Sequence, residues 1–137
     1  MIRRCCTVLL LLALLLLPAA QAEAPQETPR PARGYVLVQS AGVSGWLPLP
    51  ATEEESYSFP IRQRDQYGGL VENVLRLTPE GVYMESATCE NHDCIEQGIV
   101  TLENRQTRPL MNYILCLPNQ VSIALYTPEE VLALFGK

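Results

Sequence analysis

The chain has 137 residues, with 10 basic and 15 acidic side chains and a net charge of −5. This length is enough for one domain. A protein surface that binds the phosphates of DNA or RNA requires clustered Lys and Arg. The acidic balance excludes such a nucleic-acid-binding surface, and the only lysine is the last residue, Lys137.

The first 22 residues show the parts of a secretory leader in the required order. Arg3 and Arg4 precede an apolar run over residues 7–17, and a small-x-small cleavage site follows at residues 20–22. The run is shorter than the ~20 residues that span a bilayer, which favours cleavage, although an uncleaved signal anchor stays open. We therefore predict an extracytoplasmic protein, secreted or tethered to the outer face of the cytoplasmic membrane.

Residues 23–33 contain three prolines and no large apolar side chain, so we predict an extended, disordered linker. Without residues 1–22, which include Cys5 and Cys6, the chain keeps 115 residues, with 8 basic against 15 acidic side chains and a net charge of −7. The folded part is expected to begin at Gly34.

From Gly34 onward, apolar residues alternate with polar ones and turn residues interrupt them at short intervals, which is typical of β-strands. The turn signals are flexible backbone at 41–45, a tight hairpin turn at 78–81 and a turn at 118–120 that includes Asn119. The acidic run 53–55 is expected to be a solvated loop. The pattern predicts a single, mostly β domain over 34–126, a small sandwich or barrel. The predicted strands are 35–38, 46–49, 57–62, 72–77, 82–85, 99–102, 113–117 and 121–126.

The segment 127–137 breaks this pattern. Thr127 at the N-cap, Pro128 at the first helical position and Glu130 three residues after the cap form a capping box, which predicts a short helix over 128–135. Its apolar side is expected to pack on the β domain, and a partner-docking helix is the alternative. That side consists of Val131, Leu132, Leu134 and Phe135.

Several spaced motifs resemble the signature of the NusG domain II family. They are Cys-Glu-Asn-His-Asp-Cys at 89–94, Gln-Gly-Ile at 97–99 and Ile-Leu-Cys-Leu-Pro-Asn at 114–119, preceded by a hairpin over 73–84. The resemblance implies a compact, β-sandwich-like domain over 34–126, found as an insertion in some NusG transcription factors and as stand-alone exported or membrane-tethered proteins. It does not imply a role in transcription, because nothing here resembles the other NusG domains.

Cys89, Cys94 and Cys116 are the three cysteines of the predicted domain, and export makes a disulfide plausible. Cys89 and Cys94 are closest in sequence, but a bridge between Cys94 and Cys116 would close a longer loop, and spacing alone does not fix the pairing. In the third interpretation, all three thiols remain reduced and buried.

The same cysteines with His92 form the ligand set of a structural zinc site, three sulfurs and one imidazole. The spacing is unusual, because Cys89, His92 and Cys94 crowd three ligands into six residues. We therefore expect no cofactor. A redox cycle between Cys89 and Cys94 is opposed by two acidic neighbours, whose charges disfavour the thiolate.

The sequence lacks the combinations that enzymes use. It has one histidine, His92, and no Gly-x-Ser-x-Gly motif. Trp46 and Tyr113 are expected to contribute core area, with a binding surface as the alternative.

We therefore predict a non-enzymatic interaction module for another envelope protein, without nucleic acid and with membrane contact only through an uncleaved N-terminal segment. The alternatives are a thiol redox component of an extracytoplasmic system and a structural zinc domain. The predicted interaction loop is Glu90, Asn91, His92 and Asp93.

Overall fold

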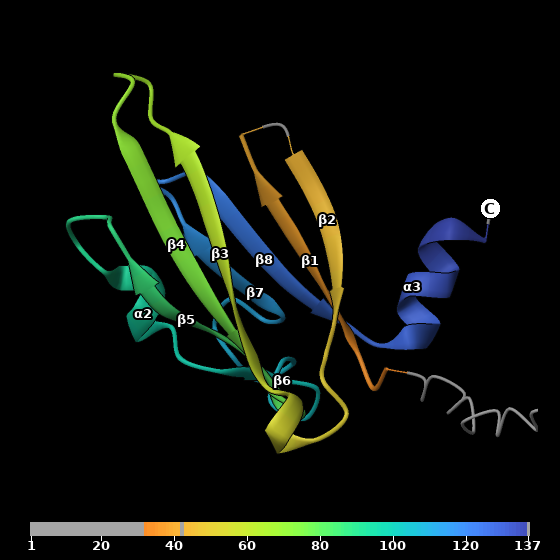
Figure 1. Ribbon diagram of the computed structural model, residues 1–137. Coiled ribbons are helices and arrows are strands. Elements are labelled where there is room, and N and C mark those ends of the chain that lie inside the picture. The colour runs from red at the N-terminus through yellow and green to blue at the C-terminus, as the bar shows by residue number, and fades with distance from the viewer. Residues whose placement is uncertain (1–31, 42, 137) are drawn as a thin grey trace, which may run out of the picture.

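The computed structural model describes residues 32–41 and 43–136 (Figure 1). The predicted leader and nearly all of the predicted linker lie outside these residues. Within them, two four-stranded antiparallel sheets face each other, which confirms the mostly β fold. The first sheet has the order β2–β1–β8–β7 and the second sheet the order β3–β4–β5–β6.

The strands are β1 (Tyr35–Ser40), β2 (Val43–Pro48), β3 (Tyr57–Arg64), β4 (Leu70–Leu77), β5 (Gly81–Ala87), β6 (Val100–Thr101), β7 (Tyr113–Cys116) and β8 (Val121–Tyr126). The helices are η2 (Glu53–Glu55), α2 (Asp93–Glu96) and α3 (Pro128–Phe135). Among the described residues, no helix combines the length and apolar character needed to cross a membrane.

The core lies between the two sheets, because alternate side chains of each strand point inward. Val36 of β1 and Leu75 of β4, for example, are both fully buried. The largest buried apolar side chains come from both layers: Val36, Ile114, Ile123 and Leu125 from the first sheet, and Leu75, Leu77, Val82, Met84 and Val100 from the second.

The predicted hairpin turn at 78–81 is confirmed. The Thr78 amide donates to the Gly81 carbonyl at 2.9 Å, and the Gly81 amide donates to the Thr78 carbonyl at 3.2 Å. Gly81 is required by a close approach between strands, since a Cβ there would lie 1.9 Å from the carbonyl oxygen of Val100 in β6. Glycine therefore allows β5 and β6 to pair.

Seven of the eight predicted strands differ from the observed strands by one to three residues at an end, and two of these differences have local reasons. The flexible turn expected over 41–45 is shorter, because β2 already begins at Val43 and Gly45 pairs with Val38. The strand expected over 99–102 is reduced to β6. There the Asn104 side chain accepts from the Thr101 amide at 2.9 Å and donates to the Ile99 carbonyl at 3.0 Å, so these backbone groups are taken up by a turn.

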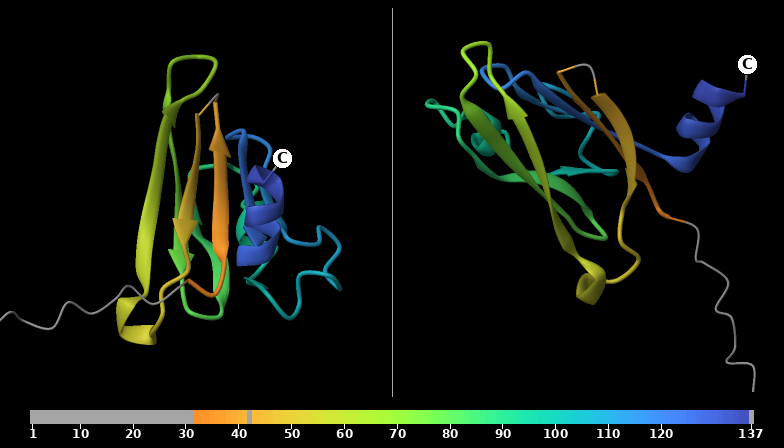
Figure 2. Two further views of the ribbon diagram at one scale, coloured as in Figure 1. Left: turned by 90° about the vertical axis from the view of Figure 1, so that its right-hand side faces the viewer. Right: turned by 45° about the horizontal axis from the view of Figure 1, so that its top comes forward.

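Helix α3 has the predicted bounds and the predicted capping box. The Thr127 amide donates to the Glu130 carboxylate at 2.8 Å, and the Glu130 amide donates to the Thr127 hydroxyl at 3.3 Å. The helix has no buried residue. It projects from the end of β8, as the right-hand view of Figure 2 shows.

The packing of α3 on the sheets is much less extensive than expected. The ring of Phe135 meets the ring of Trp46 edge-on, with centroids 5.9 Å apart. Phe135 is nevertheless 68% exposed, and Leu132 is 72% exposed. The helix is short and directly follows β8, and an ion pair between Arg105 and Glu130 fixes the position of its first turn. Most of the apolar surface of α3 therefore faces solvent.

Candidate functional site

Three buried cysteines meet at one side of the sandwich. Cys89 follows the end of β5, Cys94 lies in α2, and Cys116 ends β7. Their sulfur atoms all lie within 4.8 Å of one another, and the Sγ atoms of Cys89 and Cys94 are 3.6 Å apart. Each cysteine is at most 3% exposed, and all three are free thiols. The structure thus brings together the three cysteines identified in the sequence.

A short turn places Cys94 inside and its neighbours outside. His92 has a left-handed backbone (φ 54°), and its carbonyl accepts from the Ile95 amide at 2.9 Å at the start of α2. The predicted interaction loop is exposed along its whole length. Its members are Glu90, Asn91, His92 and Asp93.

The imidazole of His92 is not part of the sulfur cluster. Among the described residues, the group of side chains close enough to share one metal ion consists of Cys89, Cys94 and Cys116 alone. The left-handed backbone at His92 and its exposed side chain account for this separation. The four-ligand set considered from the sequence is therefore reduced here to three sulfurs.

Gln97 fixes α2 against β7, a role that its sequence pattern did not suggest. Its side-chain amide donates to the Leu115 carbonyl at 2.8 Å and accepts from the Leu115 amide at 2.8 Å. The guanidinium of Arg108 donates to the Gln97 carbonyl at 2.7 Å and to the Tyr113 carbonyl at 3.0 Å. These bonds hold Cys94 beside Cys116.

The environment of Cys94 favours its neutral thiol form. Burial raises the pKa of the Cys94 thiol well above its usual range, and hydrogen bonds with Cys116 and Cys89 raise it further. A thiol of this kind is a poor nucleophile at neutral pH, because the thiolate is the reactive species.

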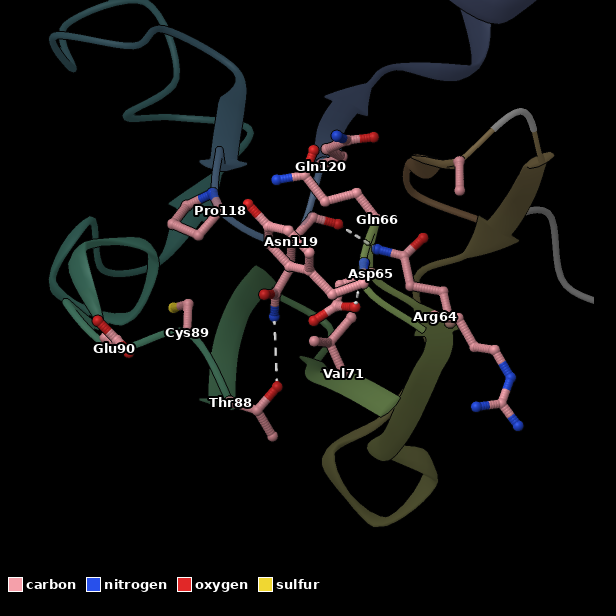
Figure 3. Close-up of a pocket in the computed structure, with 13 residues that line it drawn as sticks. Arg64, Asp65, Gln66, Val71, Thr88, Cys89, Glu90, Pro118, Asn119 and Gln120 are labelled. Carbon is pink, nitrogen blue, oxygen red and sulfur yellow. Dashed lines mark hydrogen bonds between the residues drawn. The ribbon is translucent and has the colours of Figure 1, made fainter. Parts of the chain in front are cut away.

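Beside the cluster lies a polar pocket with a volume of about 590 Å³ (Figure 3). Cys89 lies on its wall with Asp65, Thr88 and Asn119, and Figure 3 shows Asn119 pointing towards Thr88. The Asn119 amide also donates to the buried Asn73 side chain at 2.8 Å. The sequence indicated Asn119 only as a turn residue.

Fold and site together define a small two-sheet β domain with a buried cluster of three thiols. A family model described as NusG domain II matches residues 6–128, which is most of the chain. The chain belongs to the NusG domain II family.

Two solved structures of one other protein show the same fold. The solution structure of the Lin0431 protein from Listeria innocua matches 74% of this chain and 80% of that protein, at 14% identity and a TM-score of 0.56. Its crystal structure matches 69% of this chain and 97% of that one, at 11% identity and a TM-score of 0.50. A DUF1312 family protein from Ruminococcus gnavus covers 68% of this chain and 97% of its own, at 22% identity and a TM-score of 0.43. A comparison with curated proteins gives no match.

Proposed function

We propose that this NusG domain II protein is an exported, non-enzymatic interaction module that binds another envelope protein through the outer face of its first sheet and α3. The observation that carries the proposal is the contrast between the two outer faces of the sandwich. One face is aromatic and apolar, whereas the other is charged.

The outer face of the first sheet carries an apolar row across all four strands. Trp46 of β2 pairs with Leu37 of β1, Leu37 pairs with Ala124 of β8, and Ala124 pairs with Tyr113 of β7. Trp46 also contacts Tyr126, with ring centroids 5.5 Å apart. Ala124 is itself buried in this row, whereas Leu37 and Trp46 are half-buried and Tyr113 is 37% exposed. Solvated faces of antiparallel sheets are usually polar, so these partly exposed apolar and aromatic side chains favour a surface that another protein covers.

Helix α3 extends this apolar face. Phe135 touches Trp46, while Leu132, Leu134 and Phe135 are between 57% and 72% exposed. Aromatic and large apolar side chains with this exposure are the usual anchors of a protein interface. A partner that offers an apolar groove or strip would bury them.

The outer face of the second sheet satisfies its own polar groups. Arg62 forms an ion pair with Glu72. Ser58 donates to Glu85 at 2.6 Å and accepts from Arg76 at 3.3 Å. These groups need no partner, so the second sheet supplies a matched control surface.

An envelope partner is favoured by the predicted leader and by the chain's acidic charge. The formal net charge of −5 opposes binding to nucleic acid. A thiol-redox function has less support, since burial raises the pKa of the Cys94 thiol and disfavours its reactive form.

Photo-crosslinking in the native host tests the proposal. A photoreactive amino acid replaces Phe135 in α3, Arg62 on the second sheet or His92 in the loop before α2, and the cells are fractionated before the products are identified. We expect one discrete heterologous product from position 135 in the envelope fraction, and none from position 62.

Three results would contradict this proposal. They are a yield at position 135 no higher than at position 62, products that contain only copies of this chain, and a cytosolic location of the product. A product from position 92 alone would move the interface to the predicted loop and would contradict the use of α3.

A further inference from the structure

The sulfur cluster has a geometry that neither free thiols nor a single disulfide requires. A disulfide joins two sulfurs at about 2.05 Å and would leave one of the three cysteines unused. Here Cys89 after β5, Cys94 in α2 and Cys116 in β7 converge on one buried point, with all their sulfurs within 4.8 Å of one another.

We propose that Cys89, Cys94 and Cys116 form a three-sulfur site for a soft, thiophilic metal ion of the Zn(II) or Cu(I) class, and that His92 is not a ligand. Three sulfurs around an ion at a metal–sulfur distance of about 2.3 Å lie roughly 4 Å apart. The separation of 3.6 Å between Cys89 and Cys94, and the limit of 4.8 Å for all three pairs, bracket that value.

The surroundings of the cluster prepare it for an ion. The two hydrogen bonds between Gln97 and Leu115, both 2.8 Å, fix the ligand on α2 beside the ligand on β7. Such supporting bonds keep ligands in place before the metal arrives. Cys89 borders the pocket of about 590 Å³, so this side of the cluster lies close to solvent.

The chemistry of the ligand set decides the class of ion. Thiolates select Zn(II), Cu(I) and iron–sulfur centres over hard cations. Cu(I) is satisfied by three sulfurs, whereas Zn(II) needs a fourth ligand, which a water molecule would supply. Each metal–sulfur bond replaces an S–H bond and releases its proton to solvent, so neither the sulfur nor the ion changes oxidation state.

The test uses the full chain in detergent, with Cys5→Ser and Cys6→Ser to remove the leader thiols. The protein is reduced without oxygen, mixed with Zn(II) or Cu(I), and passed over a weak chelator. We expect about one retained ion per chain, protection of all three thiols from alkylation, and three sulfur neighbours in X-ray absorption. For the Zn(II)-loaded protein we expect one oxygen neighbour in addition, from the bound water. For the Cu(I)-loaded protein we expect the three sulfurs alone.

Two kinds of variant sharpen the result. Cys94→Ser or Cys116→Ser should weaken retention at least about tenfold, as even loss of supporting residues does in other metal sites. His92→Ala should leave it unchanged. If a serine variant fails to fold, thiol protection in the chain with all three cysteines still decides the question.

The proposal is overturned by any of three results. They are three alkylatable thiols and no retained ion after loading, an equal loss of the ion in His92→Ala and Cys116→Ser, and a bridge between two of the cysteines that persists under reductant.

Discussion

Two buried asparagines join the two layers of the sandwich. Asn73 lies in β4 of the second sheet, and Asn119 lies in the turn between β7 and β8 of the first. They are 1% and 5% exposed, and the Asn119 amide donates to the Asn73 side-chain oxygen at 2.8 Å. Gln63 of β3 also donates to the Asn119 carbonyl. The turn of one sheet is therefore fixed to the other by buried polar groups.

Asn73→Ala should lower the free energy of unfolding by about 1–3 kcal/mol. It removes the short hydrogen bond to the buried Asn119 amide, whose remaining contact with Thr88 is 3.5 Å long. Urea denaturation followed by circular dichroism measures the change. The control is Asn91→Ala, an exposed asparagine bonded to Asp93, which should change stability by less than about 0.5 kcal/mol. Equal effects of the two variants would refute a role for the pair in joining the sheets.

Local patterns identified single residues at the site but not their partners. Asn119 was correctly expected in a turn, and the Gln120 amide does donate to the Leu117 carbonyl at 3.1 Å. Its side-chain partner Asn73, however, is 46 positions away in the sequence. Likewise His92 is close to two cysteines in sequence, but its left-handed backbone separates it from them. Both outcomes depend on tertiary structure, which spacing does not encode.

For helix α3, the local sequence predicted the bounds of the helix but not the exposure of its apolar side chains. Its bounds could be predicted because a capping box is a local device of four residues. Its exposure could not, because the apolar pattern of a helix does not say which surface will cover it. The four-residue helix α2 was missed, since one turn is too short for a detectable period.

The first turn of α3 should respond to pH through Glu130. The Arg105 guanidinium, 2.6 Å away, lowers the pKa of the Glu130 carboxyl below its ordinary value near 4.5. A lowered folded-state pKa means that the stabilisation is present above pH 4.5 and is lost as the pH falls through the folded-state value. The effect should be less than about 1 kcal/mol, because the Glu130 side chain is 44% exposed.

Fluorescence of Trp46, the only tryptophan, reports this change because its ring contacts Phe135 in α3. We expect an emission change below pH 4.5 in the natural chain, and its loss in Glu130→Gln. Glu129→Gln, at an exposed position of the same helix, should keep it. An identical pH response in Glu130→Gln would show that another group controls α3.

For the whole molecule, alternation predicted the strands better than their arrangement. The eight predicted segments all correspond to strands, because each carries its own inward-facing apolar residues. Strand β1 is central in the first sheet because it pairs with β2 on one side and with β8 on the other, where Tyr35 faces Tyr126. The unexpected location of Trp46 and Tyr113 on the outer face is a consequence of that register.

The three-sulfur site, if loaded, should stabilise the whole molecule. Cys89 follows β5 of the second sheet and Cys116 ends β7 of the first, so one ion would link both layers. An ion that binds only the folded chain adds about 2.7 kcal/mol at a free concentration of 100 times Kd. For a domain of this size, that corresponds to a rise in Tm of at least about 5 °C.

Thermal unfolding of the reduced Cys5→Ser, Cys6→Ser chain with and without Zn(II), followed by circular dichroism, measures this rise. Cys116→Ser should abolish it because this variant removes the ligand from the first sheet, whereas His92→Ala should retain it. Retention of the ion with an unchanged Tm would mean that the folded and unfolded chains bind it equally well. In that case, the convergence of β5, α2 and β7 would make no contribution to metal affinity.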